Sequence, residues 1–138
     1  MQRAESAAAS NAWEITTVAR ILVVDDERSL LKLYQKELQE EGHEVRTAVN
    51  AQEAIEYFRR ERPDLVVLDI RLPGMDGLEA VGHFMSIDRG VPVVFNTAYP
   101  SFRDNFLSWI ADAYVDKSSD LGELKRTIKN LLSARVAA

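Results

Sequence analysis

Three short runs of this chain are apolar without polar alternation, and stretches with helical periodicity separate them. The runs are Ile21-Leu22-Val23-Val24, Leu65-Leu68 with two valines between, and residues 91–95, in which Pro92 sits near the start. A strand that is apolar on both faces needs cover on both faces, which is typical of a parallel sheet packed between helices. The runs therefore predict an α/β fold.

Two shorter strands and five helical stretches complete the pattern. Residues 44–48 and 113–115 are the additional strands, and Asn50 with Glu53 forms a capping box before one helix. Because βα crossovers are right-handed, the order of elements favours a doubly wound five-stranded parallel sheet with five flanking helices. We expect the strand order 2-1-3-4-5, which would make the first and third strands neighbours. The helical stripes are Leu30, Leu31, Tyr34 and Leu38; Ala54, Ile55 and Phe58; Leu78, Val81, Phe84 and Met85; residues 102–109, more weakly; and Leu121, Leu124, Ile128, Leu131 and Leu132.

Length and composition predict one domain and exclude several classes of site. The 138 residues suit a single domain over residues 19–134, with a flexible or linker-like extension at 1–18 and a tail at 135–138. The net charge of −5 argues against direct nucleic-acid binding by this chain, and the absence of cysteine excludes disulfides and thiolate metal sites. No apolar stretch reaches the ~20 residues of a membrane span, and no secretion signal is evident, so we expect a cytoplasmic protein without membrane contact.

Charged and hydroxyl side chains follow the predicted strands at the point where each one ends. Asp25 and Asp26 end the first strand, Asp69 ends the third, Thr97 follows the fourth, and Lys117 follows the fifth. In open α/β sheets, ligands bind beyond the carboxyl ends of the strands, where strand order reverses. The sequence therefore predicts that the three carboxylates share one pocket with a hydroxyl and an ammonium group.

Such a cluster of carboxylates requires a compensating cation. Two unit charges ~4 Å apart repel by about 4 kcal/mol at an effective dielectric constant of about 20. An all-oxygen donor set suits a hard ion such as Mg²⁺, and Lys117 supplies a further positive charge.

Each of these residues also has an ordinary structural explanation. Asp25 and Asp26 could cap the first helix, Asp69 could be a turn residue, Thr97 a strand-end threonine, and Lys117 a solvated surface lysine. All five nevertheless fall at the same kind of position in one α/β frame, and this conjunction favours a functional site.

Other candidate groups do not suggest a second site. His43 precedes the second strand, at the opposite edge from the carboxylates, and His83 lies within the third helix, so both are predicted to be surface or packing residues. The region around Gly74 and Gly77 lacks the spacing of a phosphate-binding glycine loop.

At this point the sequence resembles the receiver domain of two-component response regulators, a phosphoacceptor with a flavodoxin-like fold. The resemblance runs from about Arg20 to Leu132, and as a set its motifs are specific. They are Ile21-Leu22-Val23-Val24-Asp25-Asp26-Glu27, Asp64-Leu65-Val66-Val67-Leu68-Asp69 with Leu72-Pro73-Gly74-Met75-Asp76-Gly77, Thr97-Ala98, and Ala113-Tyr114-Val115-Asp116-Lys117.

The resemblance implies a phosphorylation-driven switch rather than a turnover enzyme. Asp69 would accept a phosphoryl group from the phosphohistidine of a histidine kinase, or from a phosphotransfer protein. Thr97 would hydrogen-bond the phosphoryl oxygens, Lys117 would pair with them, and Tyr114 resembles the aromatic residue whose rotamer follows Thr97. The fourth helix, fifth strand and fifth helix would then form the face that contacts a downstream effector.

The resemblance also implies a metal site for Mg²⁺ or Mn²⁺. Asp26 would be a direct ligand, Asp25 would act mainly through water, and the backbone carbonyl of Arg71 would join the Asp69 carboxylate.

Three positions depart from the family pattern. Ser118 follows Lys117 where proline is usual, and Ile110 stands where glycine usually precedes the fifth strand. Asn96 puts a polar group where an apolar strand residue is usual. None of these changes removes a reactive group, so we expect the chain to remain competent for phosphorylation.

Three other functions on a related frame are less well supported. A phosphatase of the haloacid-dehalogenase type needs a second aspartate two residues after its nucleophile, and this position holds Arg71. A phosphorylation-independent scaffold would not need the complete set of strand-end residues. A flavin-nucleotide binder would need a Ser/Thr-rich loop after the first strand, which is absent.

Overall fold

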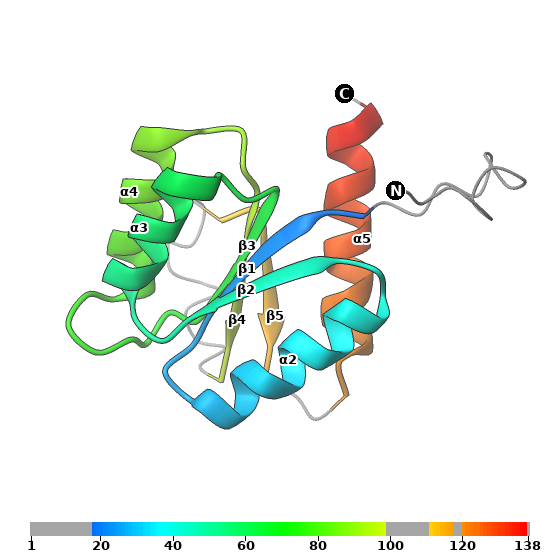
Figure 1. Cartoon of the computed structure of the whole chain (residues 1–138), viewed down its shortest axis with the longest axis horizontal. Helices are drawn as coiled ribbons and strands as arrows, with labels where there is room; N and C mark the ends of the chain where they lie inside the picture. The colour runs from blue at the N-terminus through cyan, green and yellow to red at the C-terminus, as the bar shows by residue number, and fades with distance from the viewer. Residues whose placement is uncertain (1–17, 99–110, 118–119, 138) are drawn as a thin grey trace, which may run out of the picture.

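The computed structural model describes residues 18–98, 111–117 and 120–137, which form a five-stranded sheet between two layers of helices (Figure 1). All strand pairs are parallel, and their order is β2-β1-β3-β4-β5, which confirms the predicted topology. The described part contains four helices; the further helix predicted over residues 102–109 lies outside it, as do Ile110 and Ser118. The elements are β1 (Arg20–Val24), α2 (Arg28–Glu40), β2 (Glu44–Ala48), α3 (Ala51–Glu61), β3 (Leu65–Leu68), α4 (Gly77–Ile87), β4 (Val93–Thr97), β5 (Ala113–Asp116) and α5 (Gly122–Ala137).

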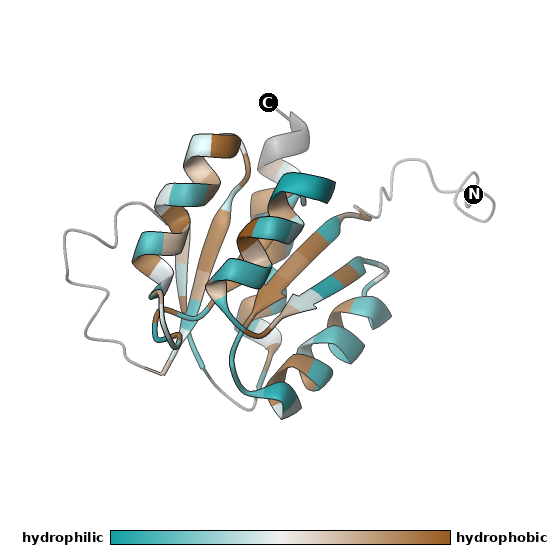
Figure 2. Cartoon of the chain, turned by 60° about the vertical axis from the view of Figure 1, so that its left-hand side comes forward, coloured by the Kyte–Doolittle hydropathy of each residue, from teal (hydrophilic) through white to brown (hydrophobic). Residues whose placement is uncertain are grey.

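Helices α3 and α4 cover one face of the sheet, and α2 and α5 cover the other (Figure 1). Alternate residues of the central strands feed the two layers: Ile21 and Val23 pack with α2 and α5, while Leu22 and Val24 pack with α3 and α4. The central strands are correspondingly hydrophobic along most of their length, unlike the edge strand β2, and the helices show hydrophilic outer sides (Figure 2). This two-sided burial explains why the apolar runs lack polar alternation.

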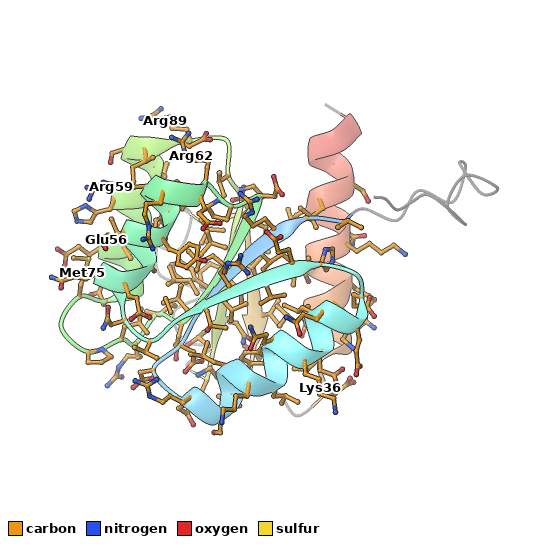
Figure 3. The ribbon with its side chains drawn as sticks, in the orientation of Figure 1. Lys36, Glu56, Arg59, Arg62, Met75 and Arg89 are labelled. Atoms are coloured by element: carbon orange, nitrogen blue, oxygen red, sulfur yellow. The ribbon has the colours of Figure 1, made fainter. Side chains whose placement is uncertain are left out.

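Local capping chemistry fixes where α3 begins. The Asn50 side chain accepts a hydrogen bond from the Glu53 amide at 2.8 Å, and Glu53 Oε1 accepts one from the Val49 amide at 3.0 Å, so the predicted N-cap is confirmed. Glu56 and Arg59 project from the outer side of this helix, away from the sheet (Figure 3). The arginine lies in the last turn, where a positive charge complements the helix dipole.

The fourth strand begins two residues later than the apolar run that predicts it. Pro92 has no amide hydrogen, although its carbonyl accepts a hydrogen bond from the Val66 amide at 3.0 Å. The first amide of β4, that of Val93, donates to Asp112 Oδ2 at 2.8 Å, and the strand then continues through Asn96 and Thr97.

The ends of the domain differ slightly from the predicted limits. Val18 is exposed, and the rest of the predicted N-terminal extension lies outside the described residues. Helix α5 continues to Ala137, into the segment predicted as a tail. Among the described helices, none has the length and apolar character needed to cross a membrane.

Candidate functional site

Three carboxylates converge at the carboxyl edge of the sheet, as predicted. Asp25 and Asp26 follow β1, and Asp69 follows β3; each offers an oxygen, and these oxygens all lie within 4.8 Å of one another. The Asp69 amide donates to the Val24 carbonyl at 3.1 Å, which extends the pairing of the two strands into the site. Asp25 and Asp69 are buried, whereas Asp26 is exposed.

Lys117 crosses the sheet edge from the end of β5 and bridges the two buried carboxylates. Its Nζ lies 2.7 Å from Asp25 Oδ2 and 2.8 Å from Asp69 Oδ2. The Lys117 amide donates to the Thr97 carbonyl at 2.8 Å, which anchors the lysine backbone to the end of β4. Glu27, which the strand-end pattern does not predict, is a further partner: its Oε1 lies 3.7 Å from Nζ.

Burial and pairing have opposing effects on the protonation of this cluster. Burial raises the pKa of Asp69 above its ordinary value, although the Lys117 ammonium opposes that change. Burial also disfavours the charge of Lys117, but the hydrogen bonds to Asp25 and Asp69 outweigh it and raise the lysine pKa. The ammonium is therefore retained at neutral pH.

The loop after β3 holds Asp69 through its backbone. The Arg71 amide donates to Asp69 Oδ1 at 3.2 Å, so the residue predicted to supply a backbone ligand lies beside the carboxylate. The Gly77 amide donates to the Ile70 carbonyl at 2.7 Å, and a Cβ atom at Gly77 would lie only 2.5 Å from the Asp69 carbonyl oxygen. Only glycine permits this approach of α4 to the site.

The role of Gly77, the first residue of α4, was not predicted from the sequence. The preceding residue, Asp76, caps α4 by accepting a hydrogen bond from the Glu79 amide at 2.9 Å. The Asp76-Gly77 pair followed by Glu79 was the available signal, since an aspartate with an acidic residue three positions later is typical of a helix start.

Thr97 and Tyr114 lie on adjacent strands. Thr97 is buried at the end of β4, and β4 pairs Phe95 with Tyr114 on β5. The two aromatic rings are in contact, with centroids 5.2 Å apart. Because Thr97 is two residues beyond Phe95, its side chain faces the same side of the sheet as these rings.

Asn96 is accommodated by a partner that sequence reasoning did not find. Its Nδ2 donates to the Tyr34 hydroxyl oxygen at 3.0 Å, between β4 and α2, and both residues are buried. The helical stripe placed Tyr34 in the core, but no local signal links two residues that are 62 positions apart.

Neither histidine belongs to the site. His43 Nδ1 accepts a hydrogen bond from the Ala19 amide at 3.2 Å, at the opposite edge of the sheet, while His83 is exposed on α4. The expectation that they serve packing or surface roles is confirmed.

The acidic cluster fits a hard divalent cation. Its donors are all carboxylate oxygens, the exposed Asp26 gives the cluster access to solvent, and Lys117 already holds a positive charge between Asp25 and Asp69. These groups together form an acidic cluster whose oxygen donors suit such a cation.

Comparison with known proteins gives the family. The model of the response regulator receiver domain matches residues 21–129. The transcriptional regulatory protein PrrA of Mycobacterium tuberculosis is 39% identical over 121 residues, which cover 86% of this chain and 52% of PrrA. The chain therefore spans about half the length of such curated relatives.

Solved structures agree with that assignment. The response regulator TrrA of Thermotoga maritima, in complex with Mg²⁺ and BeF, matches with a TM-score of 0.78 and 46% identity, covering 81% of this chain and 97% of TrrA. TrrA bound to the histidine kinase ThkA matches with a TM-score of 0.77 and 46% identity, over 82% of this chain and 97% of that chain. The chain belongs to the response regulator receiver domain family.

Proposed function

We propose that Asp69 is the phosphoacceptor of this receiver domain, and that the domain is a phosphorylation-driven switch rather than a turnover enzyme. The observation that supports this role is the arrangement of the Asp69 carboxylate, 2.8 Å from the Lys117 ammonium and within 4.8 Å of two further carboxylates. A relative in complex with a histidine kinase supports the proposal that the phosphoryl donor is a kinase phosphohistidine or a phosphotransfer protein.

The proposed reaction is a direct displacement at phosphorus. A carboxylate oxygen of Asp69 attacks, an O–P bond forms, and the N–P bond of the phosphohistidine breaks with its electron pair returning to the imidazole. The product is an acyl phosphate that carries roughly −2 charge at the acceptor. Positioning and charge neutralisation supply the catalysis, because phosphoryl transfer needs little covalent participation by the protein.

Lys117 and Thr97 would hold the transferred group. Phosphorylation of Asp69 removes one carboxylate partner of the lysine ammonium. The ammonium then pairs with the phosphoryl oxygens. The buried Thr97 hydroxyl, at the neighbouring strand end, donates a hydrogen bond to the same oxygens. Movement of Thr97 would be followed by a change of the Tyr114 rotamer. The surface that β5 forms with α5 would then transmit the change to a downstream effector.

Asp25, Asp26 and Asp69, with the backbone carbonyl of Arg71, would hold Mg²⁺ or Mn²⁺. When bound, the ion neutralises the negative charge shared by the acceptor and the phosphoryl group. The Mg²⁺-containing relative TrrA supports this choice of cation.

The test is labelling with a small phosphodonor such as acetyl phosphate, which releases acetate, in the presence of Mg²⁺. We expect one phosphoryl group per chain, mapped to Asp69 and released by hydroxylamine or alkali, since an acyl phosphate is a mixed anhydride that these nucleophiles cleave. A label that resists hydroxylamine and alkali, or a label on another residue, would contradict the proposal. No labelling with intact Mg²⁺ binding would favour the phosphorylation-independent scaffold.

A further inference from the structure

The hydrogen bond between Tyr34 and Asn96 lies in the layer beneath the proposed acceptor. Strands β3 and β4 pair Leu68 with Phe95, and the next residue on each strand is Asp69 and Asn96 respectively. The residues two positions earlier, Val67 and Val94, both pack with α2 and α5. Asp69 and Asn96 therefore start from neighbouring strands on the same face of the sheet.

The surroundings of Tyr34 place its hydroxyl close to the charged cluster. Burial raises the pKa of Tyr34, the Asn96 hydrogen bond opposes this rise, and the charges of Lys117, Asp25 and Asp69 all act on the phenol. The hydrogen bond to Asn96, the residue before Thr97, shows that the Tyr34 side chain reaches from α2 to the end of β4.

Asp69 already has one donor on each oxygen: Lys117 on Oδ2 and the Arg71 amide on Oδ1. A further donor would stabilise its negative charge, and that stabilisation would have to be given up when an oxygen attacks phosphorus. The amide of Asn96 is the neighbouring group of this kind, since an asparagine amide carries two N–H bonds and seeks a partner when buried.

We propose that Tyr34 is a positioning residue of the phosphoacceptor site: its hydroxyl accepts the Asn96 amide and keeps that amide turned toward α2, away from the Asp69 carboxylate. Tyr34 acts on Asp69 only through Asn96. The inference rests on the proposed role of Asp69, and it identifies why a polar residue is tolerated before Thr97.

The decisive comparison is between one single variant and one double variant. Tyr34→Phe removes the acceptor and lets the Asn96 amide turn to Asp69, so labelling by acetyl phosphate at saturating Mg²⁺ should slow on the order of tenfold, the cost of giving up one charge-assisted hydrogen bond. Tyr34→Phe/Asn96→Leu removes the competing donor as well, so labelling should return close to the wild-type rate. Tyr57→Phe, on α3, is the matched control and should leave the rate unchanged.

A purely structural role gives a different pattern. If the pair only packs α2 against the sheet, Tyr34→Phe lowers stability but labels at the wild-type rate, and that outcome overturns the inference. A double variant that stays as slow as Tyr34→Phe also overturns it, because the slow step would then not depend on Asn96.

A second measurement separates this inference from the proposed function. In NMR spectra of the Tyr34→Phe protein, adding Asp69→Ala should shift the side-chain amide resonances of Asn96, whereas in the wild-type background the same change should leave them almost in place. This readout needs no phosphorylation. Absence of labelling in the wild type would refute the acceptor role, while unshifted Asn96 resonances in both backgrounds would refute the role of Tyr34.

Discussion

Aspartate side chains lie at the ends of strands on both edges of the sheet, but their partners differ. At the amino edge, Asp64 Oδ2 accepts the Arg20 amide and Asp112 Oδ2 accepts the Val93 amide, each at 2.8 Å. At the carboxyl edge, Asp25 and Asp69 face each other across the ammonium of a lysine.

Asp69 also accepts a backbone amide, that of Arg71, so the difference between the two edges is the additional lysine partner at the carboxyl edge. A backbone amide at a strand start cannot leave its acceptor unless the strand moves, so the amino-edge aspartates are part of the ladder. The Lys117 side chain has a flexible four-carbon stem, so its ammonium group can exchange one anionic partner for another. The carboxyl edge therefore holds charges that can be redistributed when a cation or a phosphoryl group arrives.

Exchanging one carboxylate at each edge for an amide should give the largest contrast. Asp69→Asn keeps the shape of the side chain but removes the nucleophile, so labelling by acetyl phosphate should fall below detection while the circular dichroism spectrum is retained. Asp64→Asn keeps a carbonyl oxygen for the Arg20 amide and should be labelled like the wild type. Label retained in Asp69→Asn would assign the acceptor to another residue.

Removing one charge from the metal cluster should have the next largest effect. Asp26→Asn should weaken Mg²⁺ binding by on the order of tenfold or more, since only a few carboxylates would hold the ion, and labelling should fail at ordinary Mg²⁺ concentrations. Glu27→Gln changes the adjacent exposed carboxylate and should have a much smaller effect. Equal Mg²⁺ affinity of wild type and Asp26→Asn in calorimetry would exclude Asp26 as a ligand.

Most of the sheet and the residues at its carboxyl edge could be predicted from the sequence, because they depend on short-range patterns and on topology. The apolar runs and the Asn50 cap are local signals, and parallel order then brings Asp25, Asp69 and Lys117 to one edge. The hydrogen bond from Asn96 to Tyr34 was not predictable in this way, because it depends on how α2 packs against β4.

The close contact of Gly77 with the Asp69 backbone is a second feature that the hydrophobic periodicity of the sequence does not predict. Gly77→Ala would place a Cβ 2.5 Å from the Asp69 carbonyl oxygen and 2.8 Å from Ile70 Cα. Overpacking of this kind costs about 1–3 kcal/mol. Gly82→Ala, in the same helix with no atom within 4 Å of the added carbon, should instead stabilise by about 0.5–1 kcal/mol.

Urea unfolding measures both alanine variants, and labelling reports on the site. Gly77→Ala should lower the free energy of unfolding and slow labelling, because α4 and Asp69 cannot both keep their positions. A Gly77→Ala protein as stable and as reactive as Gly82→Ala would show that the loop adjusts without moving the acceptor.

Loss of an amino-edge carboxylate should affect stability alone. Asp112→Ala leaves the Val93 amide without its side-chain acceptor and should lower the free energy of unfolding by about 1–2 kcal/mol, with an unchanged labelling rate. Asp112→Asn retains an acceptor oxygen and should recover most of the loss. A slower labelling rate in Asp112→Ala would show that the two edges are coupled through β4.

The smallest expected effect is a pH dependence confined to the amino edge. Burial lowers the pKa of His43 below its ordinary value of 6.5, and its Nδ1 accepts the Ala19 amide, an interaction that protonation of Nδ1 abolishes. The charged groups facing this ring include Glu41, which opposes the shift. Because the unfolded chain binds the proton more readily than the folded one, the contribution of His43 to stability is present above pH 6.5 and is lost as the pH falls through the folded pKa.

The urea midpoint of the wild type should therefore decline more steeply below pH 6.5 than that of His43→Gln, which cannot titrate. His83→Gln, which changes the exposed histidine of α4, should follow the wild-type curve. Parallel curves for the wild type and His43→Gln would show that protonation of His43 does not weaken the amino edge, where Asp64 and Asp112 still accept backbone amides.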